Sequence, residues 1–155
     1  MKKGILILLI TFISCSQNGK NSKNINTRNL QNWTEYRTKD SIPELLKLTL
    51  AKLNNGEFKI ANPNEQFNAT DVIVNDSLPS RQLILVAKRK IDWRIIYTQG
   101  GVGMYYVISQ CKIRDDSIFD FKIAHTLVEY VNNDTIDKLL CEQRIKWKDI
   151  KITYE

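Results

Sequence analysis

Very short connections between successive apolar segments constrain the fold of this chain more than any other feature of its sequence. Residues 83–87 are apolar without interruption, and residues 91–97 alternate between apolar and polar types. The glycine-rich GGVG at 100–103 and the pair Asp115-Asp116 separate two further segments, 104–113 and 118–123. Strands joined by so few residues must pair with antiparallel neighbours, because a parallel crossover needs about a dozen residues or more. The sequence therefore predicts an antiparallel meander.

The pattern within each segment predicts which faces are covered. The run at 83–87 is typical of a strand in the middle of a sheet. In 91–97, Trp93 and Tyr97 share one face while Asp92 and Arg94 lie on the other, which predicts one wetter face. A short apolar run at 72–74 and the alternation over 150–154 predict further strands. GGVG lacks the Gly-Lys-Ser/Thr ending of a phosphate-binding loop, so we interpret it as a hairpin turn.

Two segments carry helical signals. In SIPELLKLTLAKLNNG, residues 41–56, Ser41 and Glu44 have capping-box spacing, Pro43 suits the first turn and Asn54-Asn55-Gly56 supplies a stop. An apolar stripe runs along this helix at Ile42, Leu45, Leu46, Leu48, Leu50 and Leu53. Near the C-terminus, Asp134 and Asp137 can cap a helix whose apolar face holds Ile136, Leu139 and Leu140.

These elements predict the α+β class and one globular domain over residues 33–155. We expect an N-terminal helix packed on an antiparallel meander of about five strands. A short C-terminal helix and a final strand complete the expected domain.

The start of the chain is a segment of another kind. Lys2 and Lys3 precede an apolar run over residues 4–13, broken only by Thr11. A transmembrane helix needs about 20 apolar residues, so this run has about half the required length. A basic start and a short apolar core are typical of an export signal.

Phe12-Ile13-Ser14-Cys15 follows, and it resembles the lipobox of bacterial lipoproteins, a family recognised by a cysteine directly after a small residue. The resemblance covers residues 1–16 only, and Phe12 departs from the aliphatic residue that the family usually has there. It implies removal of residues 1–14, diacylglycerol on the Cys15 thiol and acylation of the new amine, for example with palmitate. Ser16 in place of an aspartate implies the outer membrane, and we expect the domain on its periplasmic side rather than on the cell surface. An ordinary secretory signal cut after Ser14-Cys15-Ser16, giving a secreted soluble protein, is the alternative.

The residues after Cys15 predict a tether. Residues 16–32 read SQNGKNSKNINTRNLQN, with no acidic residue and few large apolar ones. Such a segment cannot bury enough surface to order itself. As a flexible coil it would have a root-mean-square end-to-end distance of about 25 Å. Without Lys2 and Lys3 the net charge of +6 falls to +4. This mild charge on an exported chain argues against a nucleic-acid partner.

Few residues of the domain indicate chemistry. His125 is the only histidine, and neither a nucleophile motif nor zinc-ligand spacing accompanies it. We therefore predict no catalytic residue, no metal and no cofactor. The alternative is an envelope hydrolase whose carboxylates meet only in the fold, with Asp120, His125 and Glu129 as the residues to inspect first. Asp115-Asp116 is interpreted as a turn.

Basic and aromatic residues gather on the two strands over 81–97. Such side chains can bind a glycan, a lipid headgroup or an acidic protein surface, although charged residues also protect strand edges. The candidate binding surface consists of Arg81, Lys88, Arg89, Lys90, Trp93, Arg94 and Tyr97.

Cys111 and Cys141 are the two thiols that remain if Cys15 carries lipid. In an oxidising compartment they can form a disulfide, or Cys111 can stay free in the core. Taken together, the sequence predicts a membrane-anchored lipoprotein with a small binding or accessory domain. Its expected partner, besides the membrane, is an unknown envelope protein or glycan.

Overall fold

The computed structural model describes residues 32–73, 75–129 and 132–152. The predicted leader, Cys15 and the tether up to residue 31 lie outside these residues. Among the described residues, no helix is both long and apolar enough to cross a membrane.

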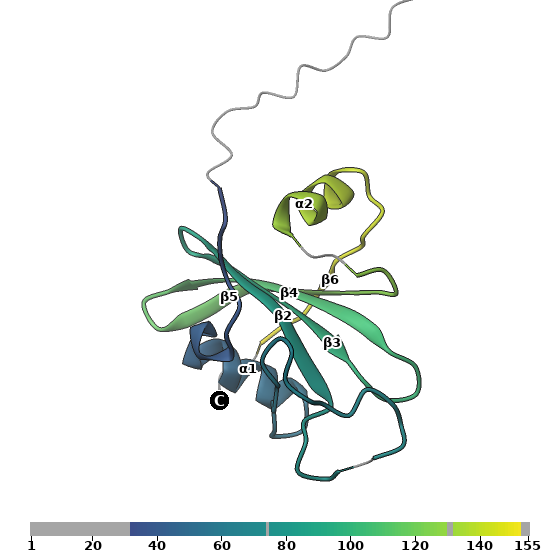
Figure 1. The fold of residues 1–155 in the computed structure, drawn as a ribbon. Coiled ribbons are helices and arrows are strands. Elements are labelled where there is room, and N and C mark those ends of the chain that lie inside the picture. Colours follow the sequence, from purple (N-terminus) through teal and green to yellow (C-terminus); the bar gives the residue numbers. More distant parts are fainter. Residues whose placement is uncertain (1–31, 74, 130–131, 153–155) are drawn as a thin grey trace, which may run out of the picture. The chain divides into compact units, whose positions relative to one another are not determined.

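One antiparallel sheet forms the centre of the described domain (Figure 1). Its strands follow one another in space as they do in the chain. They are β1 (Thr34–Tyr36), β2 (Arg81–Arg89), β3 (Asp92–Gln99), β4 (Tyr105–Arg114), β5 (Ser117–Thr126) and β6 (Lys148–Asp149). The prediction of an α+β domain with an antiparallel meander is confirmed. The predicted turns are confirmed too: the GGVG segment joins β3 to β4, and Asp115-Asp116, both with positive φ, join β4 to β5.

The number and order of the elements differ from the prediction. The described part of the sheet has six strands rather than about five, and the strand β1 precedes the first helix. β1 has three exposed residues and therefore no alternation that a sequence pattern could reveal. Of the strand predicted at 72–74, Val72 and Ile73 are exposed in a loop, and residue 74 lies outside the described residues. The closing strand β6 precedes the predicted 150–154, of which 150–152 lie outside any strand and the rest outside the described residues.

The first helix begins later than predicted. The 3-10 turn η1 (Lys39–Ser41) contains Ser41, and α1 (Glu44–Leu53) has Pro43 as its N-cap without a side-chain hydrogen bond, so the capping-box prediction is wrong. The predicted stop is confirmed, because Gly56, with φ +100°, donates its N–H to the carbonyl of Ala51 at 2.8 Å. The apolar stripe is narrower than expected: its centre is buried, but Leu48 is 54% exposed.

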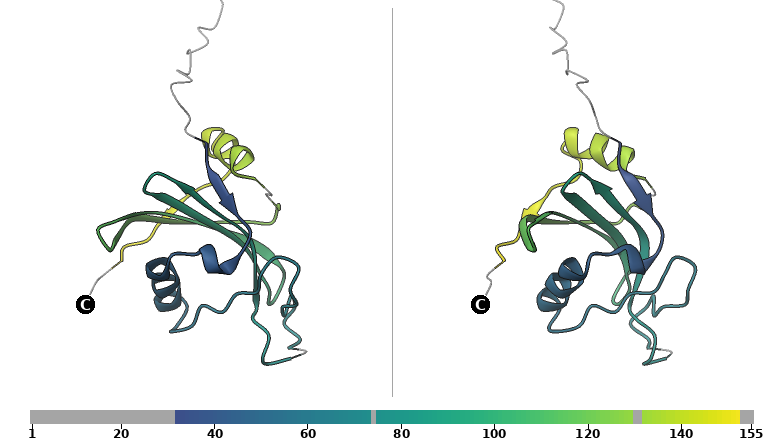
Figure 2. Two further views of the ribbon diagram at one scale, coloured as in Figure 1. Left: turned by 60° about the vertical axis from the view of Figure 1, so that its left-hand side comes forward. Right: turned by 90° about the vertical axis from the view of Figure 1, so that its left-hand side faces the viewer.

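A helix covers each face of the sheet (Figure 2). On one face, Leu46 and Leu50 of α1 pack in a cluster with Ile95 and Tyr97. On the other, Ile136 of α2 (Asn133–Cys141) packs with Leu85, Ile96 and Ile108. Burying each such aliphatic side chain stabilises the fold by about 1.5–3 kcal/mol. Coverage of both faces explains why β2 is buried continuously from Leu83 to Ala87, as predicted.

The cap of α2 is not the predicted one. The side chain of Asn132 accepts a hydrogen bond from the N–H of Thr135, whereas Asp134 and Asp137 lie inside the helix. Asp137 instead points back toward the sheet, where it contacts residues described below.

Candidate functional site

Residues 54–80 connect α1 to β2, and those that the structure describes, all but residue 74, form no helix or strand of their own. Loops longer than about 12–15 residues in a compact domain are usually either functional or disordered. This loop is held in place by specific contacts, which makes the surface beside it a candidate site.

The first half of the loop is fixed against η1 and β2. The side-chain oxygen of Asn62 accepts the N–H of Lys39 at 2.7 Å, and Asn62 donates to the carboxylate of Glu65 at 2.7 and 2.9 Å. Ala61 pairs with β2 through two backbone hydrogen bonds of 2.9 Å, and Gln82 donates to the carbonyl of Glu65. These bonds satisfy polar groups that a buried loop would otherwise leave unpaired.

The second half of the loop lies against the β3–β4 connection. Asn68, only 8% exposed, donates to the carbonyls of Asn75 and Leu78 at 2.8 and 3.1 Å. The backbone carbonyl oxygen of Asn68 would be 2.1 Å from a Cβ atom added at Gly100. Glycine is therefore required at position 100, because any side chain would push the loop away.

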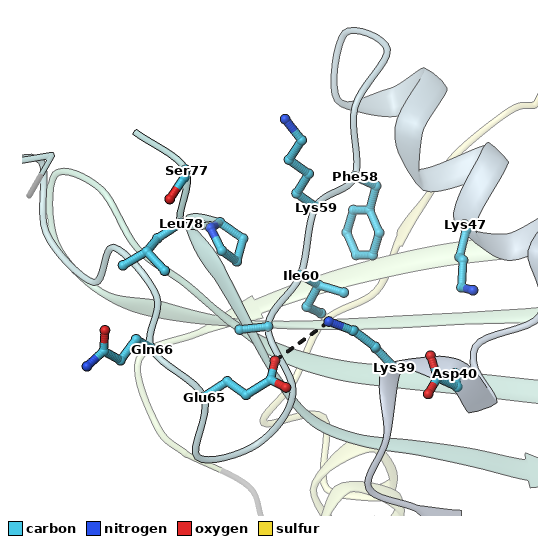
Figure 3. Close-up of a pocket in the computed structure, with 12 residues that line it drawn as sticks. Lys39, Asp40, Lys47, Phe58, Lys59, Ile60, Glu65, Gln66, Ser77 and Leu78 are labelled. Atoms are coloured by element: carbon cyan, nitrogen blue, oxygen red, sulfur yellow. Dashed lines mark ion pairs between the residues drawn. The ribbon is translucent and has the colours of Figure 1, made fainter. Parts of the chain in front are cut away.

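A pocket of about 570 Å³ opens between this loop, η1 and α1 (Figure 3). Phe58, Ile60 and Leu78 form much of its apolar lining. Phe58 packs edge-on against Tyr97 at 5.4 Å between ring centroids, and the Arg81 guanidinium lies 5.3 Å from the Phe58 ring. The size and the mixed lining are typical of small-molecule sites.

Three lysines from three different elements line the same pocket, which we call the lysine pocket. Lys39 comes from η1, Lys47 from α1 and Lys59 from the loop. Each lies near a carboxylate: Lys39 is 3.7 Å from Glu65, Lys47 is 3.4 Å from Glu44, and Lys59 is 3.1 Å from Glu57. These pairs are largely exposed and hence weak, so an anionic ligand can compete for the ammonium groups.

Two carboxylates are also part of the pocket. Asp40 and Glu65 both line it. Hydrogen bonds from the backbone and side chain of Asn62, and then the nearby Lys39, lower the pKa of Glu65. A general acid at neutral pH needs a raised pKa, so this lowered pKa does not favour Glu65 as a proton donor. The arrangement suits binding of an anionic group beside an apolar one.

Sequence reasoning missed these three lysines because no periodic pattern joins them. They are brought together only by the course of residues 54–80. Apart from the short apolar run at 72–74, that long stretch shows no helix or strand periodicity, and this was the one available signal.

The predicted basic surface does not exist as one surface. Arg81, Trp93 and Tyr97 lie on the α1 face, where Lys88 stacks 5.0 Å from the Trp93 ring. Arg89 and Arg94 lie on the α2 face, and Lys90 lies in the hairpin between β2 and β3. Tyr97 and Arg94 are 4% and 1% exposed, so neither can contribute to a binding surface.

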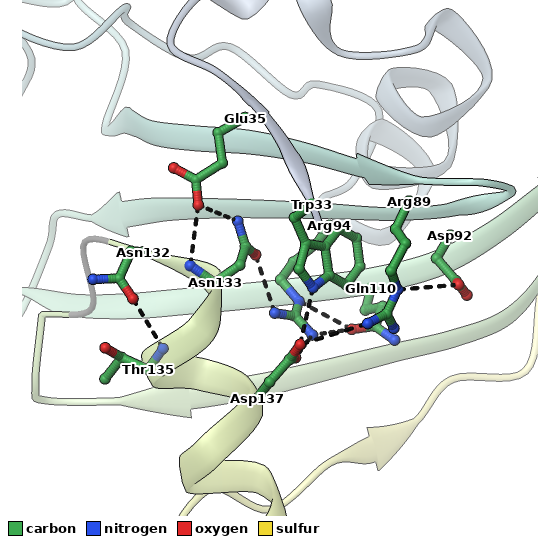
Figure 4. A network of polar contacts seen from close by, with 10 residues as sticks. All are labelled: Trp33, Glu35, Arg89, Asp92, Arg94, Gln110, Asn132, Asn133, Thr135 and Asp137. Carbon is green, nitrogen blue, oxygen red and sulfur yellow. Dashed lines mark hydrogen bonds and ion pairs between the residues drawn. The ribbon is translucent and has the colours of Figure 1, made fainter. Parts of the chain in front are cut away.

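Arg94 is instead the centre of a buried polar network (Figure 4). Its Nε and Nη2 donate to Gln110 at 3.0 and 2.7 Å, Nη1 donates to Asn133 at 3.0 Å, and Nη2 donates to Asp137 at 2.7 Å. The wetter face predicted for β3 is therefore wrong. Arg94 and Thr98 are both buried on that face, and Arg94 contacts α2.

The same network reaches the start of the domain. The Trp33 indole donates to Asp137 at 2.9 Å, and both the Arg89 and Arg94 guanidinium carbons lie 4.4 Å from its ring. Asn133 donates to Glu35 through its backbone and its side chain. Burial lowers the pKa of Arg94 and Asp137 opposes that shift, but an arginine stays charged in proteins. We call these residues the Arg94 network: Trp33, Glu35, Arg89, Arg94, Gln110, Asn133 and Asp137.

The three residues considered for a hydrolase are not brought together. Asp120 pairs with Lys112 at 2.8 Å and Lys122 at 2.9 Å, which lower its pKa. His125 packs edge-on against Tyr105, on the α1 face. Glu129 lies near Tyr106 on the other face, where partial burial and then this carboxylate raise the pKa of Tyr106. Among residues 32–73, 75–129 and 132–152, no three His, Cys, Asp or Glu side chains gather as metal ligands.

Both described cysteines are free thiols. Cys111 is fully buried in the cluster beneath α1, and burial raises the pKa of its thiol to about 12. Cys141 is exposed at the end of α2, which covers the opposite face. The structure therefore favours the free-thiol alternative.

Comparison with known proteins adds no relative: no family model, no curated protein and no solved structure matches the chain.

Replacing Asp137 with alanine tests the Arg94 network. The Arg94 guanidinium would stay buried without its anionic partner, so we expect the free energy of unfolding to fall by about 3 kcal/mol. Urea denaturation with linear extrapolation measures this loss.

Two further variants make this test specific. Arg94→Met combined with Asp137→Leu removes both charges and should recover most of the loss. Asp134→Asn, at an exposed position of the same helix, should cost less than about 1 kcal/mol. A similarly small cost for Asp137→Ala would contradict the structural role of the network.

Thiol reactivity tests the state of the two cysteines. In Cys15→Ser protein kept without reductant at about pH 8, an aromatic disulfide reagent should label Cys141 at once. Cys111 should react only after unfolding, because its thiol is buried and protonated. If neither thiol reacts even in denaturant, the two are bridged and the free-thiol structure is wrong.

Proposed function

We propose that this protein is an envelope lipoprotein whose folded domain works by binding. Three sequence features support the anchor: the basic, apolar leader, the lipobox-like Phe12-Ile13-Ser14-Cys15, and the polar segment over residues 16–32. Two or more acyl chains on Cys15 would hold the protein stably at a membrane. The proposed location is the periplasmic side of the outer membrane.

The lysine pocket is the observation that carries the binding proposal. An opening of about 570 Å³ combines an apolar lining with ammonium groups supplied by η1, α1 and the loop. Apolar surface provides affinity for hydrocarbon, and the lysines select a negative charge. We therefore propose an anionic, partly apolar ligand derived from the envelope or presented by an envelope partner.

Calorimetric titration with octyl phosphate tests this proposal. Replacing both Lys47 and Lys59 with glutamine should weaken binding about tenfold, because each partly exposed charge pair contributes up to about 1 kcal/mol. The matched control replaces Lys52 on α1 and Lys138 on α2, which are exposed and do not line the pocket. The control should bind as the unchanged protein does.

Two comparison ligands separate the contribution of the apolar chain from that of the negative charge. Inorganic phosphate should bind much more weakly, since it lacks the chain that packs on Phe58 and Ile60. Octyltrimethylammonium should not bind, since its charge has the wrong sign for the lysines. Equal affinity for the cationic and anionic ligands would rule out the lysine pocket as an anion site.

A further inference from the structure

A second pocket, of about 420 Å³, opens on the α1 face of the sheet. Leu53 and Asn54, at the end of α1, form one wall, and β3 to β6 supply most of the rest. Its described lining shares no residue with that of the lysine pocket. We call this opening the His125 pocket, and its rings and charged groups belong to Tyr97, Tyr105, His125, Lys146 and Lys148.

Strand pairing places the aromatic side chains on one face. Tyr97 of β3 pairs with Val107 of β4, and Val107 pairs with His125 of β5. Residues that pair directly across neighbouring strands share a face of the sheet, and Tyr97 belongs to the cluster beneath α1. The His125 ring lies there too, 5.5 Å from the Tyr105 ring between centroids. Three rings from three adjacent strands therefore line the same opening.

The segment at β6, the edge of the sheet beyond β5, adds two lysines to these rings (Figure 1). Lys148 pairs with Ile123, which packs on the α1 cluster, whereas Trp147 packs on the α2 cluster. Since side chains alternate along an extended chain, Lys146 and Lys148 both lie on the α1 face. Among residues 32–73, 75–129 and 132–152, no ion pair involves either lysine. Both ammonium groups are thus available to a ligand.

The His125 pocket offers few acceptors. No aspartate or glutamate that the structure describes lines it. Its two amides are already engaged: Asn54 donates to the carbonyl of Leu50 at 2.6 Å and accepts from Arg81 at 2.7 Å, and Gln99 donates to the carbonyl of Gly100 at 2.9 Å. A ligand rich in hydroxyl groups needs acceptors as well as donors, so this lining suits an anion better than a neutral sugar.

The Tyr97 hydroxyl is a further donor. Burial raises the pKa of Tyr97 to about 12, although Arg81 and Ser109 act in the opposite direction, so the phenol stays protonated at neutral pH. Those two neighbours also carry buried atoms, Arg81 Nε and Ser109 Oγ, without a hydrogen-bond partner among the described residues. Buried polar atoms are rarely left unpaired in folded proteins. Their position beside Tyr97 marks this part of the domain as a place where polar ligand atoms are favoured.

We propose that the His125 pocket binds a small anion built on an aromatic ring, such as an aromatic carboxylate. Its ring would pack offset or edge-on against Tyr105 and His125, the arrangements that aromatic groups prefer. Its carboxylate would meet the ammonium groups of Lys146 and Lys148. The volume of the pocket lies in the range of small-molecule sites. This proposal does not depend on the lysine pocket.

Proton NMR of the His125 ring tests the proposal at the site itself, because the chain has no other histidine. In untagged Cys15→Ser protein, titration with 2-naphthoate should shift the His125 signals to a saturating value, through the ring current of the bound ligand. Lys146→Gln combined with Lys148→Gln should raise the half-saturating concentration about tenfold without affecting folding, because both lysines are exposed. Lys90→Gln with Lys138→Gln, exposed and outside the pocket, is the matched control and should change nothing.

Two further probes separate the aromatic ring from the charge. Naphthalene-2-carboxamide has the rings without the charge, and decalin-2-carboxylate has the charge without the aromatic rings. Each should bind several-fold more weakly than 2-naphthoate. Equal binding of the carboxamide and 2-naphthoate, or of the two carboxylates, would overturn the proposal.

The same NMR signal separates this site from the lysine pocket. Lys47→Gln with Lys59→Gln should leave the His125 titration unchanged, whatever their effect on octyl phosphate binding. His125 signals that show no saturable shift, or a half-saturating concentration that Lys146→Gln with Lys148→Gln leaves unchanged, would contradict binding in the His125 pocket and would leave the lysine pocket unaffected.

Discussion

The buried charge of Arg94 is the constraint on which one whole face of the sheet depends. Its guanidinium is almost fully buried and is met by acceptors from β4 and α2. Burying such a charge without partners would cost several kcal/mol, so β3 can hold Arg94 only when α2 is docked. Trp33 and Glu35 extend the same constraint to the start of the domain. One side chain thereby fixes both the first strand and the last helix.

The opposite face of the sheet is held together by apolar packing, and it supports the loop over residues 54–80. α1 and Phe58 pack on the cluster around Tyr97, and residues 54–80 run from there along the end of the sheet. One side of this loop contributes to the lysine pocket. The lysine pocket thus depends on this loop, and Gly100 permits the close approach of the loop to the connection between β3 and β4.

Local signals in the sequence predicted the meander, its turns and the end of α1, because these depend on residues close in the chain. The position of Arg94 depends on a contact with α2 and looked like an ordinary polar place in an alternating strand. One sequence feature did indicate that this face is covered. The uninterrupted apolar run at 83–87 requires that both faces of the sheet be covered. The lysines of the pocket come from three unrelated segments, and β1 is too short to show a pattern. Neither could be predicted without the tertiary structure.

The proposed protein is a folded binding domain joined to a lipid anchor, and it depends on the modification of Cys15. Trp33, where the proposed tether meets the domain, is held by the Arg94 network, so the domain would be attached to the membrane at a rigid point. Intact-mass spectrometry of the protein extracted from its native cell envelope tests this claim most directly. We predict a chain that begins at Cys15 and carries a diacylglycerol group and an additional acyl chain. An unmodified amino terminus, or a leader still attached, would contradict it.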